Sequence, residues 1–211
     1  MKTIDWYFDF ISPFAYLQSE HLYRVHGDIA IQRKPVLFAG LLNHWGHKGP
    51  VEIPAKRTFT YRHAHWLAQR HGLPFRMPPA HPFNPLRSLR LAVALDGDAT
   101  VVQTIFRHIW REGKTTDNPE DWAILIHELG LTDADARISE PEVKDQLRRN
   151  TEEAVTHGVF GVPTFVIDGE LFWGFDATDM LLDYLKEPTL FQDPEMQRIS
   201  VLPAAIHRKL A

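Results

Sequence analysis

Residues 8–17 decide the fold of this chain, and they read Phe8-Asp9-Phe10-Ile11-Ser12-Pro13-Phe14-Ala15-Tyr16-Leu17. An apolar, strand-like run from Ile4 to Phe10 ends abruptly at Ser12-Pro13, where a helical pattern begins. Ser is a favoured N-cap, and Pro suits the first helical turn because its missing N–H would be unpaired there anyway. The stretch therefore predicts a strand that leads into a helix, with one hydroxyl at the helix N-terminus.

Two interpretations of Ser12 follow from this placement. A helix N-terminus presents free N–H groups and a partial positive charge, so it favours an anion. Ser12 would then hold an anion or a thiolate. Alternatively, Ser12 only caps the helix, which is the usual work of Ser at this position. These residues alone leave both interpretations open.

Composition narrows the class of protein. The chain has 211 residues with 44% hydrophobic content, which suits one globular unit or one core with an insertion. It has no cysteine, which excludes disulfides, thiolate metal sites and a cysteine nucleophile. The formal charge of −4 gives no overall attraction to nucleic acid. The N-terminus has no apolar signal core and no run approaches membrane-spanning length, so a soluble cytoplasmic protein is expected.

Apolar periodicity and breakers predict the elements along the chain. Strands are expected at 3–10 and 29–38, and a hairpin at 163–167 and 170–173 around Asp168-Gly169. Helices are expected at 13–26, 56–71, 86–95, 99–112, 119–129, briefly after 132, and at 140–157 and 176–186. Residues 39–55 are predicted to be an irregular loop, and 73–85 a proline-rich connector. The tail, 187–211, is expected to form a short helix or to pack against a partner.

This order of elements predicts an α/β protein with a thioredoxin-like fold and a helical insertion. The thioredoxin-like domain would be discontinuous, with residues 1–40 and 156–211, and residues 41–155 would form the helical insertion domain. The insertion would lie over the strand ends, where open α/β sheets bind ligands.

Three motifs of this fold carry the expected chemistry. Ser12-Pro13-Phe14-Ala15 stands where thioredoxin folds usually carry Cys-x-x-Cys, so disulfide exchange is excluded, but its hydroxyl can still donate to the thiolate of an external thiol such as glutathione. Val162-Pro163 precedes the hairpin; it is either a cis bond facing the first helix or an ordinary trans proline. Asp176 follows the last strand. It either caps the next helix, or accepts a hydrogen bond from the α-amine of glutathione, or does both.

Together with Pro54-Ala55-Lys56, these motifs resemble those of the 2-hydroxychromene-2-carboxylate isomerases of the DsbA superfamily. Kappa-class glutathione transferases are related to that family, and the resemblance covers nearly the whole chain. It implies that Ser12 hydrogen-bonds the glutathione sulfur, while the Val162 backbone pairs with the cysteinyl unit ahead of cis Pro163. The γ-glutamyl end would be bound by Trp173, Gly174, Phe175 and Asp176.

The resemblance also implies an activity and a substrate. The glutathione thiolate would add reversibly to a chromene-carboxylate from aromatic catabolism, the ring would open, and cis-trans isomerisation would follow with glutathione regenerated. Asn84 would contact the organic substrate, and Lys56 either meets its carboxylate or is an exposed lysine at a helix start. A kappa-like transferase and a non-catalytic or chaperone-like member are the alternatives. Relatives are commonly dimers, so a homodimer is expected.

Two departures from the family pattern bear on the site. The asparagine common after Gly46 is His47 here, and the arginine usual after Asp176 is Ala177. The missing arginine removes a possible anion contact. No metal is expected, because His44 with His47, and His63 with His65, lack further ligands at motif spacing.

Overall fold

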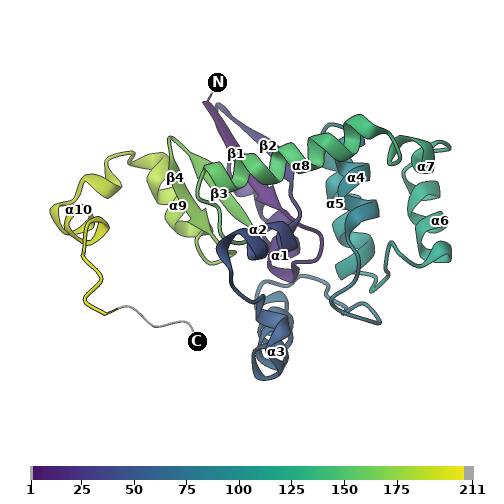
Figure 1. Ribbon diagram of the computed structural model, residues 1–211, viewed down its shortest axis with the longest axis horizontal. Coiled ribbons are helices and arrows are strands. Elements are labelled where there is room, and N and C mark those ends of the chain that lie inside the picture. Colours follow the sequence, from purple (N-terminus) through teal and green to yellow (C-terminus); the bar gives the residue numbers. More distant parts are fainter. Residues whose placement is uncertain (1, 207–211) are drawn as a thin grey trace.

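A computed structural model describes residues 2–206, and its sheet is built from both ends of the chain (Figure 1). The four strands are β1 (Lys2–Phe8), β2 (Ile29–Pro35), β3 (Thr164–Ile167) and β4 (Glu170–Trp173). Their order in the sheet is β2-β1-β3-β4. β1 runs parallel to β2 and antiparallel to β3, and β3 pairs with β4 as a hairpin. This is the thioredoxin-like α/β fold that the sequence predicts.

The segment between β2 and β3 is helical. The α-helices of residues 2–206 are α1 (Pro13–Ser19), α2 (Phe38–Trp45), α3 (Pro54–Arg70), α4 (Leu86–Ala94), α5 (Ala99–Trp110), α6 (Pro119–Glu128), α7 (Ala134–Arg137), α8 (Pro141–Thr156), α9 (Thr178–Lys186) and α10 (Pro194–Ser200). Helices α4 to α7 lie at one end of the sheet and α10 at the other (Figure 1). None of the helices within residues 2–206 is both long and apolar enough to cross a membrane.

Strand β1 is buried on both faces, as its nearly continuous apolar run predicts. Successive side chains of a strand point to opposite faces. Trp6 joins a large core cluster on one face, and Tyr7 joins a smaller cluster on the other, which includes Leu41. The large cluster also contains Phe106 of α5, so the insertion and the sheet share one core. The domain division at residues 41 and 155 stays a prediction, and 207–211 lie outside the described residues.

The loop predicted at 39–55 is wrong in its first part, because α2 occupies Phe38–Trp45. This helix has no side-chain cap of its own, and Gly40 lies within it. Its N-terminus is capped from a distance: the Leu37 N–H donates to Thr151 Oγ1 (3.1 Å), and the Phe38 N–H donates to Asp9 Oδ2 (2.9 Å). Tertiary partners supply what the local sequence lacks.

Other boundaries differ by smaller amounts. The helix predicted at 13–26 ends at Ser19, and a separate 3₁₀ turn follows at Leu22–Arg24. The first strand ends at Phe8 and the second at Pro35, and the Val36 N–H beyond it still donates to the Phe8 carbonyl (2.9 Å). The helix predicted from residue 176 begins at Thr178, with no side-chain cap. The short helix predicted for the tail is α10.

Gly97 provides a test of the packing between the insertion and the sheet. It has φ +66°, and a Cβ there would lie 2.5 Å from the backbone oxygen of Arg33 on β2. Gly130 has the same φ of +66° but no heavy atom within 4 Å of the corresponding position. We expect Gly97→Ala to lower the free energy of unfolding by about 1–3 kcal/mol more than Gly130→Ala, because only Gly97→Ala adds overpacking to the shared backbone strain. Urea unfolding of both variants measures the difference, and equal losses would show that this contact does not constrain the fold.

Candidate functional site

The turn between β1 and α1 is organised around the buried carboxylate of Asp9, which is 1% exposed. Asp9 Oδ1 accepts from the Ile11 N–H (3.0 Å), and Oδ2 accepts from the Phe38 N–H (2.9 Å). The Asp9 carbonyl accepts from the Ser12 N–H (3.1 Å). One residue therefore holds both its own turn and the start of α2. Sequence reasoning missed this role, although an acid inside an apolar strand-like run is a signal for it.

Two donors from the insertion hold the remaining carbonyls of this turn. Trp110 Nε1 donates to the Phe10 carbonyl (2.8 Å), and His81 Nε2 contacts the Ile11 carbonyl (2.8 Å). Buried backbone polar groups need such partners, since an unpaired group loses its bonds to water. The connector of residues 73–85 thus reaches the turn that presents Ser12, and His81 is a second residue that the sequence did not single out.

Ser12 both caps α1 and faces the hairpin. Its Oγ accepts from the Ala15 N–H (3.2 Å) and donates to the Val162 carbonyl (3.4 Å). The second distance is long for an O–H···O bond, whose usual length is about 2.7–2.8 Å. The Ser12 hydroxyl therefore makes only a weak hydrogen bond here, and it can donate to a better acceptor instead. The N-cap interpretation is confirmed, and the anion interpretation, which is compatible with it, stays a prediction.

The Val162–Pro163 peptide is cis, as predicted, and lies opposite Ser12. The Pro163 carbonyl accepts from the Gly174 N–H (2.8 Å), which ties this bond to the end of β4. Within residues 2–206 the Val162 N–H donates no hydrogen bond. A free N–H beside Ser12 is what an extended peptide ligand could pair with.

The end of β4 completes the same surface. Trp173 is 52% exposed, and its indole lies against Gly161, where a Cβ would be 2.5 Å from Nε1. Gly174 has φ +95°, a value that favours glycine. The Asp176 carboxylate is exposed and folds back over Gly174. Ser12, Val162, Pro163 and these hairpin residues are thus contiguous.

Gln18 links this hairpin segment to α1 from within the core, and the sequence analysis missed it. The residue is fully buried. Its Oε1 accepts from Trp6 Nε1 (2.7 Å), and its Nε2 donates to the Gly174 carbonyl (3.0 Å) and to Thr178 Oγ1 (3.0 Å). A polar residue on the buried face of α1 is the signal that could have pointed to it.

Three of the predicted site residues lie differently from the contiguous group. Phe175 turns its side chain inward against His21 and His71, so only its backbone remains for a ligand. Lys56 is exposed in the first turn of α3. Asn84 is exposed, and its Oδ1 accepts from the Leu86 N–H (3.1 Å). No hydrogen bond within residues 2–206 joins Lys56 or Asn84 to Ser12.

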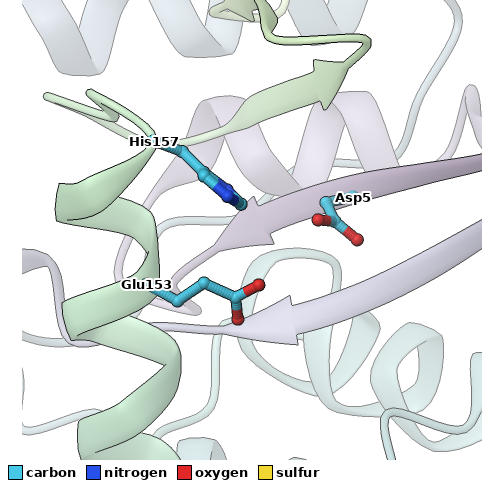
Figure 2. A group of neighbouring side chains, drawn as sticks. All are labelled: Asp5, Glu153 and His157. Carbon is cyan, nitrogen blue, oxygen red and sulfur yellow. The ribbon is translucent and has the colours of Figure 1, made fainter.

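A separate polar cluster lies between β1, β2 and α8. Figure 2 shows Asp5, Glu153 and His157 pointing toward one another, with ligand atoms within 4.8 Å. Lys34 Nζ lies 3.0 Å from Asp5 Oδ2 and 2.6 Å from Glu153 Oε1. An ammonium group already bridges the two carboxylates, so the arrangement is an ion-pair cluster that joins α8 to the sheet rather than a set of free metal ligands.

Comparisons with known proteins agree on the fold and divide over the reaction. The family model of the DSBA-like thioredoxin domain matches residues 3–186. Glutathione S-transferase kappa 2 of Caenorhabditis elegans is 30% identical over 220 residues, covering 93% of this chain and 96% of that protein. A 2-hydroxychromene-2-carboxylate isomerase of Sphingobium xenophagum is 29% identical, covering 87% and 98%. A solved 2-hydroxychromene-2-carboxylate isomerase has a TM-score of 0.78 at 24% identity, covering 92% and 98%.

Burial of Asp9 predicts a distinct dependence of stability on pH. Burial raises the pKa of this carboxyl from 3.8 to about 7, although the amides of Phe38 and Ile11 oppose the rise. Between these values the folded state keeps the proton while the unfolded state loses it. The free energy of unfolding should therefore fall by about 4 kcal/mol as pH rises from about 4 to about 7.

We expect Asp9→Asn to remove this slope, because an amide does not titrate. The variant also loses one acceptor, which lowers its stability by a constant amount, so the slope and not the level is the readout. Urea unfolding across this pH range measures both proteins, and Asp176→Asn, which changes an exposed carboxylate, is the control. Parallel curves for wild type and Asp9→Asn would contradict the assignment.

Proposed function

The chain belongs to the DsbA-like thioredoxin family, as its motifs predict, and on this premise we propose that it is an enzyme that holds the thiolate of glutathione at Ser12. The observation that carries the proposal is the Ser12 hydroxyl, placed between the Ala15 N–H and the Val162 carbonyl in a chain without cysteine. Such a site cannot exchange disulfides. It can hold the sulfur of another molecule.

The residues around Ser12 fit glutathione in chemistry and in arrangement. The Val162 N–H, which has no partner in the described part of the chain, and the carbonyl of the same residue offer a donor and an acceptor to the cysteinyl backbone. The Asp176 carboxylate suits the α-ammonium of the γ-glutamyl unit, and the exposed Trp173 indole covers the ligand between them. Gly174 and the backbone of Phe175 would line the same end.

In the proposed reaction, glutathione, Ser12 and the start of α1 each have a separate role. Glutathione, when bound, supplies a thiolate that adds reversibly to an electrophilic carbon of a conjugated substrate. Ser12 exchanges its long hydrogen bond to the Val162 carbonyl for one to the sulfur, which is a stronger bond because the acceptor is charged. The Phe14 N–H adds to this stabilisation: Pro13 has no N–H, the Ala15 N–H donates to Ser12 Oγ, and within residues 2–206 the Phe14 N–H has no partner. The thiolate is therefore favoured near neutral pH.

The substrate class that we propose is 2-hydroxychromene-2-carboxylate or a related intermediate of aromatic degradation. The similarity to isomerases supports this choice. Lys56 is the proposed partner of the substrate carboxylate, since it is exposed and forms no ion pair within residues 2–206. Asn84 is proposed to contact the organic part of the substrate. A kappa-type transferase is the second candidate, and the similarity to a kappa transferase supports it.

The two reactions differ in what happens to glutathione. Isomerisation leaves the amount of free thiol unchanged, whereas transfer to an electrophile consumes it. We would measure substrate conversion and free thiol in the same reaction, first with a chromene-carboxylate and then with a halogenated aromatic acceptor. Glutathione binding that is accompanied by neither reaction would favour a non-catalytic member of the family. Absence of binding to wild type at millimolar glutathione would reject both enzyme assignments.

Replacement of Ser12 by alanine separates the two roles of the hydroxyl. Ser12→Ala removes a donor to a charged sulfur, which is worth about 1.5–3 kcal/mol, so kcat/KM should fall roughly ten- to hundredfold. Loss of the cap should cost only about 0.5–2 kcal/mol of stability. Steady-state kinetics and urea unfolding measure the two effects.

Asn118→Ala is the matched control for this variant. Asn118 caps α6 by accepting from the Glu120 and Asp121 N–H groups, and within residues 2–206 it forms no hydrogen bond to a residue of the Ser12 site. It should lose similar stability and keep full turnover. A Ser12→Ala enzyme with an undiminished rate would show that Ser12 is a cap and nothing more.

A further inference from the structure

The Ile11 peptide, immediately before Ser12, is held from both sides by ionisable groups. Its N–H donates to Asp9 Oδ1 at 3.0 Å, and its carbonyl lies 2.8 Å from His81 Nε2. A carbonyl can only accept, so His81 Nε2 must carry a hydrogen. The other ring nitrogen, Nδ1, is then the atom that gains or loses a proton.

Tyr61 faces that nitrogen in an arrangement that suits both protonation states. Its hydroxyl oxygen lies 2.9 Å from His81 Nδ1 and 2.9 Å from the His81 carbonyl oxygen. With neutral His81, the Tyr61 O–H donates to Nδ1. With the imidazolium, Nδ1–H donates to the Tyr61 oxygen and the Tyr61 O–H turns to the His81 carbonyl. Rotation of one hydroxyl hydrogen satisfies either state without movement of a heavy atom.

The other neighbours of His81 keep it neutral until an anion arrives. Burial lowers the pKa of His81, the bond to Ile11 opposes this, and the positive charge of Arg57 on α3 lowers it further. The ring also packs against the aromatic rings of Phe83 and Trp110, which carry no charge. Asp9 lies across the Ile11 peptide and is itself largely protonated below about pH 7. These described neighbours of His81 provide no negative charge beside Ser12 that would stabilise its imidazolium form.

We propose that His81 is a positioning residue of the Ser12 site, and that it takes up a proton through the Tyr61–His81 pair when a thiolate binds beside Ser12. The identity of that thiolate as glutathione rests on the proposed function. The proton balances: the thiol releases one to solvent and Nδ1 gains one, so ligand binding leaves the net charge of the site unchanged. By linkage, the imidazolium in turn favours the thiolate.

The first experiment follows His81 itself by ¹⁵N-histidine NMR titration. We would measure its pKa in the free protein, with glutathione, and with S-methylglutathione, which keeps the peptide but has no thiol. The pKa should rise by roughly one unit or more with glutathione and stay near the free value with S-methylglutathione. Bound glutathione that leaves the His81 pKa unchanged, or an equal rise with S-methylglutathione, would overturn the proposal.

Variants separate the hydrogen bond from the charge. His81→Gln keeps a donor for the Ile11 carbonyl but cannot titrate, so glutathione should bind while the pKa of its thiol rises by roughly one unit, a tenfold loss of thiolate. His81→Leu loses the donor as well and should bind more weakly at every pH. Tyr61→Phe removes the acceptor for Nδ1–H and should lower the His81 pKa. Thiolate absorbance and calorimetry give these quantities.

His65→Gln is the control, because His65 is an exposed histidine on the same helix as Tyr61. It should behave as wild type. If His81→Gln retains the wild-type thiol pKa, the charge of His81 has no role and the proposal fails. Calorimetry of wild type keeps the two hypotheses apart: absence of glutathione binding rejects the proposed function together with this inference, whereas binding without proton uptake by His81 rejects the inference alone.

Discussion

The buried carboxylate of Asp9 is the interaction on which the rest of the structure depends. Its two oxygens accept from the Ile11 and Phe38 N–H groups, which lie 27 positions apart in the sequence (38 − 11). One oxygen sets the turn that presents Ser12, and the other caps a helix that has no cap of its own. Burial disfavours the charged form of this carboxyl and raises its pKa to about 7. The two hydrogen bonds from backbone N–H groups offset part of that effect. Position of the turn and formation of α2 are therefore linked.

The helical insertion takes part in the site rather than only covering it. Trp110 of α5 and His81 of the 73–85 connector bind the carbonyls of Phe10 and Ile11, so two segments of the insertion hold the turn. Phe106 of the same insertion lies in the core with the strand residues. A change in the packing of the insertion would therefore displace the Ser12 turn through these two hydrogen bonds, because a close-packed core transmits strain.

A hydroxyl at this position gives the fold a different chemistry from a thiol. With no cysteine, the chain cannot form a mixed disulfide, and Ser12 need not act as a nucleophile. Its hydroxyl makes only a weak hydrogen bond as a donor. The orientation of that hydroxyl is set by the Ala15 N–H on one side and the Val162 carbonyl on the other. Those properties suit a group that stabilises the sulfur of a bound molecule. Under the proposed function, specificity for the ligand would depend on Trp173 and the residues after it, up to Asp176.

The sequence by itself determined the order of the elements, the cap at Ser12, the cis bond before Pro163 and the family. Each of these is written in local signals: apolar periodicity, a Ser-Pro pair, a proline before a hairpin, and motifs in order. Only the tertiary structure decided that α2 forms, that Phe175 turns inward, and that Asp9, Gln18 and His81 support the site. The physical reason is the same in each case. These outcomes depend on hydrogen bonds and packing between residues far apart in the chain, which no local pattern records.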